Sequence, residues 1–235
     1  MFIPLYDHNA LERISRPWVT WSLLLSNVLV YALFQSGVAF DADLATIISL
    51  GLFPEHLFPN DPAGEGLIGA NELIGGPLPS LVTYAFVHGG WMHLIGNMLF
   101  LFVFGDNVED AMGHFRYLLF YLLCAILAGM AHAAVDPDSR APLIGASGAV
   151  AGVIGAYLML HPRVRVWVLV LGRLPLRLPA MWVLGGWFAF QIVSLVWLFD
   201  DAVAWWAHIG GFLAGVILVI FVRKRGVPLF DRDLN

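Results

Sequence analysis

Four polar side chains that could do chemistry lie inside strongly apolar segments of this sequence: His93, Asn97, Ser147 and His208. A polar group in hydrocarbon is costly when it is unpaired, so each of them needs a partner or a function. Serine is a poor nucleophile until a base takes its proton, and histidine, with an ordinary pKa of about 6.5, is suited to that role at neutral pH. The set therefore predicts nucleophilic catalysis, with Ser147 as the nucleophile and His208 as its base.

The residues around Ser147 favour stabilisation of a developing negative charge. The stretch Gly145-Ala146-Ser147-Gly148 resembles a small-residue turn that exposes a nucleophile where a loop enters a helix. The first N–H groups of a helix lack partners within the helix and can donate to an oxyanion. His93 and Asn97 are four residues apart, so they share one face of a helix and can donate to the same charge. His88, just before that helix, is a candidate for a supporting role in orienting the loop.

The composition places these residues in a membrane protein. Of the 235 residues, 60% are hydrophobic and only 12% are charged, whereas a soluble domain carries roughly 25% charged residues. A soluble fold of this size cannot bury so much apolar surface. Segments of about 20 apolar residues, rising about 1.5 Å per residue, match a hydrocarbon core of roughly 30 Å. We therefore expect a lipid bilayer as partner and no nucleic acid, because the sequence has no basic stripe.

Apolar segments of sufficient length predict an all-α fold, a single membrane domain over residues 1–235 that forms a bundle of six transmembrane helices. A large outer loop over 37–90 separates the first two segments and contains apolar stretches that suit the membrane interface. The fourth segment is short, so the apolar stretch 142–146 before it should lie at membrane depth, covered by protein. The six expected spans are 17–35, 91–108, 115–135, 147–160, 179–199 and 204–222.

The distribution of lysine and arginine predicts the orientation. With both termini cytoplasmic, 11 of the 12 basic residues fall on the cytoplasmic side and Arg140 alone falls outside, as the positive-inside rule requires. No cleavable signal is evident, since the first apolar run is long enough to span, although the small residues 36–39 leave a cleavage site as an alternative. Ser147 and His208 then share a depth close beneath the outer surface. We expect a multi-pass protein of the cell membrane, of the bacterial inner-membrane type, with its site near the extracytoplasmic face.

Glycine spacing indicates which helices approach most closely. Gly148 and Gly152 form a small-xxx-small pair in the fourth segment, and Gly211 and Gly215 form another in the sixth. His208 lies three residues before Gly211 and so points to a similar side. We expect the serine and histidine to face each other across this contact, with Gly145, Gly148 and Gly211 as supporting residues.

Two other kinds of membrane protein are alternatives. His88, His93 and His208 could supply three nitrogen ligands to zinc, but an intramembrane metalloprotease should contain H-E-x-x-H, and Leu94 follows His93 here. Buried polar groups can also mark the path of an ion through a channel or transporter. The acidic residues nearest to a span, Asp106, Glu109 and Asp110, fall at a cytoplasmic helix end rather than in mid-membrane. We expect neither a metal nor a cofactor.

Three motifs, in order along the chain, are similar to those of the rhomboid family of intramembrane serine proteases. They are His88-Gly89-Gly90-Trp91-Met92-His93-Leu94-Ile95-Gly96-Asn97, Gly145-Ala146-Ser147-Gly148 and Ala207-His208-Ile209-Gly210-Gly211. The resemblance runs from about residue 17 to 225. It implies a six-helix bundle, a Ser147–His208 dyad without an acidic third member, and an oxyanion hole made by His93, Asn97 and the backbone N–H of Ser147. The implied substrates are transmembrane proteins, and the oligomeric state stays open.

The sequence departs from the family pattern at two points. Some relatives place a tyrosine one turn after the serine, where it stacks on the histidine, and this chain has Ala151 there. The Trp-Arg pair that many relatives carry in the first loop is also missing. A non-proteolytic rhomboid-like protein that binds membrane clients is the alternative function, although such proteins usually lack the serine or the histidine and both are present here.

Overall fold

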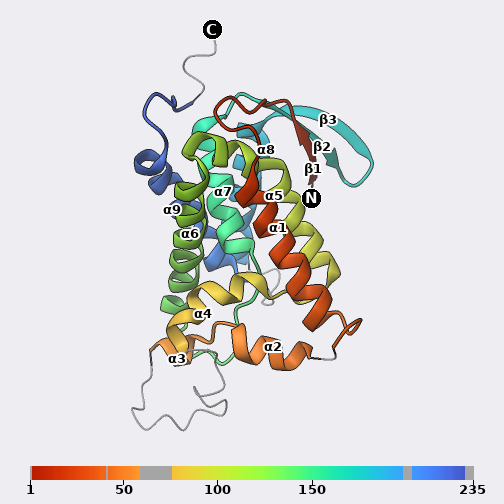
Figure 1. Cartoon of the computed structure of the whole chain (residues 1–235), viewed down its shortest axis with the longest axis vertical. Coiled ribbons are helices and arrows are strands. Elements are labelled where there is room, and N and C mark those ends of the chain that lie inside the picture. Colours follow the sequence, from red (N-terminus) through yellow and green to blue (C-terminus); the bar gives the residue numbers. More distant parts are fainter. Residues whose placement is uncertain (1, 41, 59–75, 198–202, 231–235) are drawn as a thin grey trace.

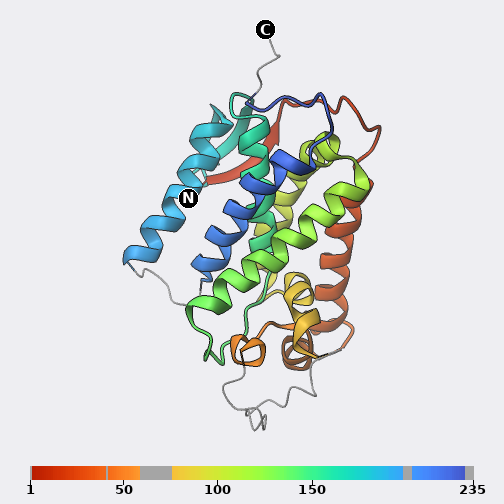
Figure 2. The same ribbon diagram turned by 90° about the vertical axis from the view of Figure 1, so that its left-hand side faces the viewer.

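The computed structural model describes residues 2–40, 42–58, 76–197 and 203–230. These residues form a mostly helical bundle with a small sheet at one end (Figures 1 and 2). The strands are β1 (Phe2–Asp7), β2 (Arg165–Val170) and β3 (Leu174–Pro179). The helices are α1 (Trp18–Val30), its π-helical continuation η1 (Tyr31–Gln35), α2 (Asp43–Leu50), α3 (Pro54–Leu57), α4 (Pro77–Thr83), the 3-10 helix η3 (Tyr84–Phe86), α5 (Trp91–Met112), α6 (His114–Val135), α7 (Ser147–Leu160), α8 (Ala180–Trp197) and α9 (Trp205–Val222).

Among the described residues, four helices are long and apolar enough to cross a membrane: α1 with η1, α6, α8 and α9. α4 and η3 together with α5 meet the same test only as a pair bent by 86°, and α7 is a shorter apolar helix. The chain is therefore a multi-pass membrane protein, while the count of six spans and the cytoplasmic termini stay predictions. Residue 41, residues 59–75 of the expected outer loop and the end of the fifth expected span, 198–199, lie outside the described residues.

The two ends of the bundle carry different structures. α2, α3 and α4 lie at one end, here called the loop end, and β1, β2 and β3 lie at the other, here called the sheet end (Figures 1 and 2). The segment after α9 belongs to the sheet end, since the Lys224 N–H donates to the Ala111 carbonyl at 2.9 Å and the Phe230 N–H to the Met159 carbonyl at 2.8 Å. Both the N-terminal strand and this C-terminal segment thus lie on the same side of the bundle.

Helix α7 forms the centre of the bundle and is buried along nearly its whole length. α7 and α9 approach each other so closely that no side chain fits between them at their glycine positions. A Cβ atom on Gly211 would lie 2.0 Å from the Gly148 carbonyl oxygen, and one on Gly215 would lie 1.9 Å from that of Gly152. Only glycine fits at such positions, because the two backbones are in direct contact. The two small-xxx-small pairs of the sequence meet here.

The stretch before α7 is held inside the protein by the segment that precedes α5. Leu52 and Leu143 exchange backbone hydrogen bonds of 3.1 and 2.8 Å, and the Gly145 N–H donates to the Tyr84 carbonyl at 3.0 Å. Irregular backbone is tolerated at membrane depth when protein satisfies its polar groups. These contacts let α7 begin below the end of the bundle, so that its first residue, Ser147, lies inside the molecule.

The three-stranded antiparallel sheet, in the order β1-β2-β3, is absent from the all-α expectation. Val166 and Val168 of β2 are buried whereas Arg165 and Trp167 are more exposed, the alternation of a strand with one covered face. β2 and β3 pair from Arg165 opposite Pro179 to Val170 opposite Leu174. The structure is therefore mostly helical rather than all-α, because β1 precedes the first expected span and β2 and β3 lie between the fourth and fifth, in stretches too short to predict as spans.

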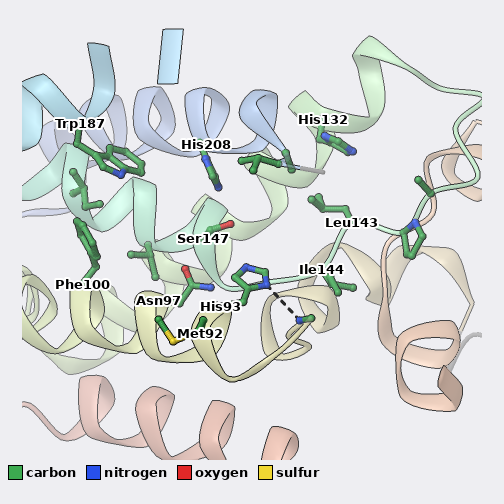
Figure 3. A pocket seen from close by; sticks show the side chains of 18 residues that line it. Met92, His93, Asn97, Phe100, His132, Leu143, Ile144, Ser147, Trp187 and His208 are labelled. Carbon is green, nitrogen blue, oxygen red and sulfur yellow. Dashed lines mark hydrogen bonds between the residues drawn. The ribbon is translucent and has the colours of Figure 1, made fainter. Parts of the chain in front are cut away.

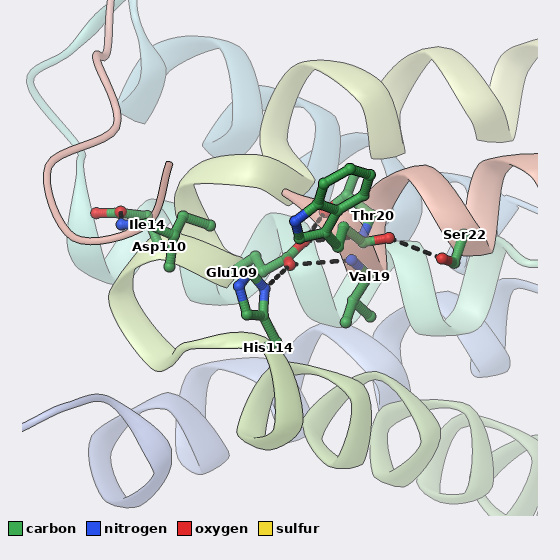
Figure 4. Close-up of polar contacts among 8 residues, drawn as sticks. Ile14, Val19, Thr20, Ser22, Glu109, Asp110 and His114 are labelled. Atoms are coloured by element: carbon green, nitrogen blue, oxygen red, sulfur yellow. Dashed lines mark hydrogen bonds and ion pairs between the residues drawn. The ribbon is translucent and has the colours of Figure 1, made fainter. Parts of the chain in front are cut away.

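Carboxylates fix the start of α1 at the sheet end (Figure 4). Glu109 accepts hydrogen bonds from the backbone N–H groups of Val19 and Thr20 at 3.0 and 2.8 Å and from the Thr20 hydroxyl at 2.7 Å. His114 Nδ1 lies 2.5 Å from the same carboxylate. The first N–H groups of a helix have no partner within it and attract negative charge. Glu109 thereby connects α5, α6 and α1.

Candidate active site

A cavity of about 680 Å³ opens toward the loop end of the bundle and is lined from several helices. α5 contributes His93 and Asn97, α7 contributes Ser147 and α9 contributes His208. Figure 3 shows the Ser147 hydroxyl between His208 on one side and His93 and Asn97 on the other. The four side chains that the sequence singled out therefore meet in one cavity, although they come from three helices.

Ser147 is the first residue of α7 and is half-buried. Its hydroxyl and the His208 ring face each other across the cavity, and no hydrogen bond joins them (Figure 3). Nucleophile and base often come within hydrogen-bonding distance only when a substrate is bound. The arrangement can support proton transfer from serine to histidine after a small movement of either side chain.

Gly145 brings the backbone before Ser147 against the side chains of α5. Its φ angle of +115° is one that L side chains rarely adopt, and a Cβ atom here would lie 2.6 Å from His93 Nε2. The same position lies 3.7 Å from Asn97 Nδ2. Glycine is thus required both by the backbone conformation and by the close approach of His93.

His93 and Asn97 present donors for which the described part of the chain supplies no acceptor. His93 Nδ1 accepts a hydrogen bond from the Gly89 N–H at 3.3 Å (Figure 3). Because a neutral imidazole carries its proton on the other nitrogen, His93 Nε2–H is the donor and lies beside Gly145. Asn97 is 8% exposed, and its Nδ2 is buried without a hydrogen-bond partner among the described residues. Two donors therefore remain free for a ligand oxygen next to Ser147.

His88 supports the turn before Ser147 rather than the cavity itself. Its backbone N–H donates to Gln35 Oε1 and its carbonyl accepts from Gln35 Nε2, both at 2.9 Å. Its Nε2 accepts from the Ala146 N–H at 3.5 Å, and its ring meets the edge of His93 with centroids 5.1 Å apart. Burial, together with the neighbouring His93, lowers the pKa of His88 to about 3. The ring therefore stays neutral and can accept the Ala146 hydrogen bond.

Sequence reasoning missed several residues of this region. Gln191 of α8 contacts His208, with Oε1 2.8 Å from Nδ1. Gln35 holds His88, and His132 of α6 lines the same cavity as Ser147. The sequence does contain a signal for Gln191, since it is an amide within the expected span 179–199, which has no charged residue. Among the described residues, no three His, Cys, Asp or Glu side chains are grouped so that they could hold a metal ion.

A second, more apolar cavity of about 560 Å³ adjoins the first. It is bounded by α5, α8, the start of α9 and the inner face of the sheet, and it shares Phe100, Trp187 and His208 with the cavity around Ser147. Trp182 and Phe190 of α8 line it and are 69% and 55% exposed. An apolar route thus leads from the outer surface of α8 to the His208 ring.

A family model described as Rhomboid domain matches residues 76–225. The chain is 30% identical over 167 residues to Rhomboid-like protein 11, chloroplastic, of Arabidopsis thaliana, covering 66% of this chain and 56% of that protein. It is 28% identical over 155 residues to Rhomboid protein 1, mitochondrial, of Saccharomyces cerevisiae, covering 62% and 42%. It is 32% identical over 80 residues to the Putative rhomboid protease YdcA of Bacillus subtilis, covering 34% and 40%. The chain spans about half the length of the curated relatives it matches. With the family model covering more than half of its residues, this chain belongs to the rhomboid family.

Proposed function

We propose that this chain is an intramembrane serine endopeptidase, which hydrolyses peptide bonds in or near the transmembrane segments of other membrane proteins. The observation that carries the proposal is the single cavity into which Ser147, His208, His93 and Asn97 all open. Family membership supports the same reaction class, and the printed name of the Bacillus subtilis relative includes the word protease.

The proposed reaction begins with attack of the Ser147 oxygen on the carbonyl carbon of the scissile peptide, while the hydroxyl proton passes to His208 Nε2. The electron pair of the C=O double bond moves onto oxygen. Donors from His93 Nε2, Asn97 Nδ2 and the backbone N–H of Ser147 stabilise that negative charge. Collapse breaks the C–N bond, and the proton on His208 goes to the leaving amine. Water then cleaves the acyl-enzyme with His208 again as base, which restores the serine.

The substrate class follows from the membrane setting. A peptide bond in an α-helix is enclosed by the helix, so a transmembrane substrate must unwind locally and should be cleaved near small or helix-breaking residues. The apolar second cavity suits a hydrophobic segment that approaches from lipid beside α8. The bias of basic residues supports a location of the Ser147 cavity near the extracytoplasmic face of a cell membrane. The named relatives include chloroplast and mitochondrial proteins, so the identity of the membrane belongs to the proposal.

A fluorophosphonate probe, which reacts with activated serines, tests the nucleophile directly. Purified protein in detergent is labelled, and the same preparation in liposomes is incubated with a panel of single-span substrates. Ser147→Ala should abolish both labelling and cleavage, and His208→Gln should reduce both to background. Ser194→Ala is the matched control, since Ser194 is a buried serine of α8 whose hydroxyl has no partner among the described residues. It should leave both measurements unchanged.

Labelling that persists in Ser147→Ala would show that another residue is the nucleophile. A protein that binds the substrates equally well with or without Ser147 and His208, and cleaves none of them, would instead support the non-proteolytic client-binding alternative.

A further inference from the structure

Gln191 of α8 touches the ring nitrogen of His208 that the proposed proton transfer does not use. Its Oε1 lies 2.8 Å from His208 Nδ1, and the glutamine is 3% exposed. Gln191 lines the apolar second cavity and not the cavity around Ser147. His208 Nε2 has no hydrogen-bond partner among the described residues, and Figure 3 draws the ring pointing toward Ser147. The two nitrogens of His208 thus face different surroundings.

The helix itself determines which way the Gln191 amide points. Gln191 Nε2 donates to the carbonyl of Trp187, four residues earlier in α8, at 3.2 Å. This contact can be made only by the NH₂ group, so the amide oxygen is the atom directed at His208. An amide oxygen only accepts hydrogen bonds, hence His208 Nδ1 must carry a proton. In a neutral imidazole the lone pair is then on Nε2, on the side of Ser147.

Two tryptophans limit rotation of the same ring. The His208 ring centroid lies 5.9 Å from that of Trp187 and 6.1 Å from that of Trp205, with interplanar angles of 38° and 88°. α7 contributes no aromatic ring to His208 one turn after the serine, since that position is the fully buried Ala151. In this chain the histidine is therefore oriented from α8 and from its own helix, not from α7.

We infer that Gln191 is a positioning residue for His208: it holds the imidazole as the Nδ1–H tautomer and directs the basic Nε2 at Ser147. The inference rests on the proposed function. When the proton of Ser147 moves to Nε2, the Nδ1–H stays donated to Gln191 Oε1, so the ring need not turn between proton uptake and proton delivery. A third group that orients the base is a general feature of hydroxyl nucleophiles. Here a neutral amide fills that place and adds no negative charge beside the ring.

Two substitutions separate positioning from packing. Gln191→Met keeps the length of the side chain but removes the acceptor, and Gln191→Glu keeps an acceptor and adds a charge. Turnover of a single-span substrate in liposomes is measured against pH, with Ser194→Ala, three residues along the same helix, as control. Gln191→Met should lower kcat by about 10- to 100-fold, the scale of a misdirected general base, with KM nearly unchanged. Gln191→Glu should retain most of the activity and move the acidic limb of the pH profile to higher pH, because a carboxylate favours the charged imidazolium.

A spectroscopic readout needs no activity. Protein with nitrogen-15 histidine, with the His208 signals assigned by their loss in His208→Gln, should show the Nδ1–H tautomer in the wild type and a mixture in Gln191→Met. An Nε2–H tautomer in the wild type, or a Gln191→Met variant with wild-type kcat and pH profile, would overturn the inference. Failure of the proposed function can be told apart from failure of this inference. In that case the wild-type protein would show no Ser147-dependent labelling, whatever the tautomer of His208.

Discussion

The buried carboxylates at the sheet end and the polar side chains at the cavity differ in their hydrogen bonding. At the sheet end, Glu109 accepts from two backbone N–H groups and a hydroxyl (Figure 4), and Asp110 accepts from the N–H groups of Arg13 and Ile14 at 2.6 and 2.7 Å. At the cavity, Asn97 Nδ2 has no partner within the described structure, and the Ser147 hydroxyl is not bonded to His208. The two carboxylates at the sheet end are thus hydrogen-bonded to the backbone, whereas the Asn97 amide nitrogen and the Ser147 hydroxyl stay open toward the cavity.

The difference separates stability from function. Buried polar groups are nearly always satisfied in folded proteins, and those that are not call for a specific explanation. At the cavity, His93 is held by the Gly89 N–H, His208 by Gln191, and the turn before Ser147 by His88. Such donors are fixed in place before a ligand arrives, which is the condition for stabilising charge in a transition state. Substitutions at the two ends should therefore have separable effects.

The sharpest test compares two asparagines of α5. Asn97→Ala removes a proposed oxyanion donor, so we expect kcat to fall by about 100- to 1000-fold, as for loss of one such donor elsewhere. The thermal stability should be unchanged or slightly higher, because the lost amide nitrogen had no partner among the described residues. Asn107, ten residues along the same helix, is 3% exposed, and its Nδ2 donates to the Asn9 carbonyl at 3.1 Å.

Asn107→Ala should show the reverse behaviour, with stability lowered by about 1 kcal/mol for a lost hydrogen bond and kcat retained. Cleavage kinetics in liposomes and thermal unfolding in detergent measure both quantities on each variant. If both substitutions lowered kcat equally, the separation between a reaction role for Asn97 and a stability role for Asn107 would be wrong.

The second test removes the charge from the sheet end. Glu109→Gln replaces an acceptor by an NH₂ group facing the N–H donors of α1, so we expect the free energy of unfolding to fall by roughly 2–4 kcal/mol. The kcat per folded molecule should stay near that of the wild type. Ser22→Ala is the control on α1, since its exposed hydroxyl only bonds the Trp18 carbonyl of its own helix. A Glu109→Gln protein of normal stability and low kcat would show that this network serves the reaction instead.

Local patterns in the sequence predicted helices α1 and α5 to α9 and the convergence of polar groups, but not the short helices α2, α3 and α4 within the expected outer loop. α7 begins at Ser147 and ends at Leu160, the bounds expected from the apolar run, because a loop with glycine and proline precedes it and a proline follows. Spacing also placed His93 and Asn97 on one face of α5. The glycine pairs indicated α7 and α9 as neighbours, since a side chain at those positions could not be accommodated.

Contacts made between distant segments were not predictable in this way. β1 pairs with β2 across more than 150 residues, and nothing local in either segment specifies that partner. The same holds for Gln191 and His208, which lie on different helices whose relative rotation sets the 2.8 Å contact. Gln35 likewise reaches His88 from η1. Polar residues in apolar runs mark such contacts as necessary, but only the packing of the helices decides which partner each one meets.

The smallest expected effect concerns Asp7 of β1 at the sheet end, whose carboxyl group is hydrogen-bonded but buried. Tyr157 donates to it at 2.5 Å, and its titratable neighbours include His161, which directly follows α7, and Asp106 of α5. Burial raises the pKa of Asp7 above its ordinary value of 3.8, and the Tyr157 hydrogen bond partly offsets that rise. A carboxyl whose pKa is higher in the folded than in the unfolded protein contributes to stability at pH values below its unfolded pKa. That contribution to the free energy of unfolding is lost as the pH rises through the folded pKa.

Between about pH 4 and neutrality, the wild type should therefore lose stability relative to Asp7→Asn, whose amide oxygen can still accept from Tyr157. Tyr157→Phe should make the decline of stability with pH steeper, because it removes the hydroxyl that favours the charged carboxylate. Thermal unfolding in detergent over this pH range measures both slopes. If the stability of wild type and of Asp7→Asn changed with pH in the same way, burial of the Asp7 carboxyl would carry no free-energy penalty. Asp7 would then be solvated, like the open groups at the cavity.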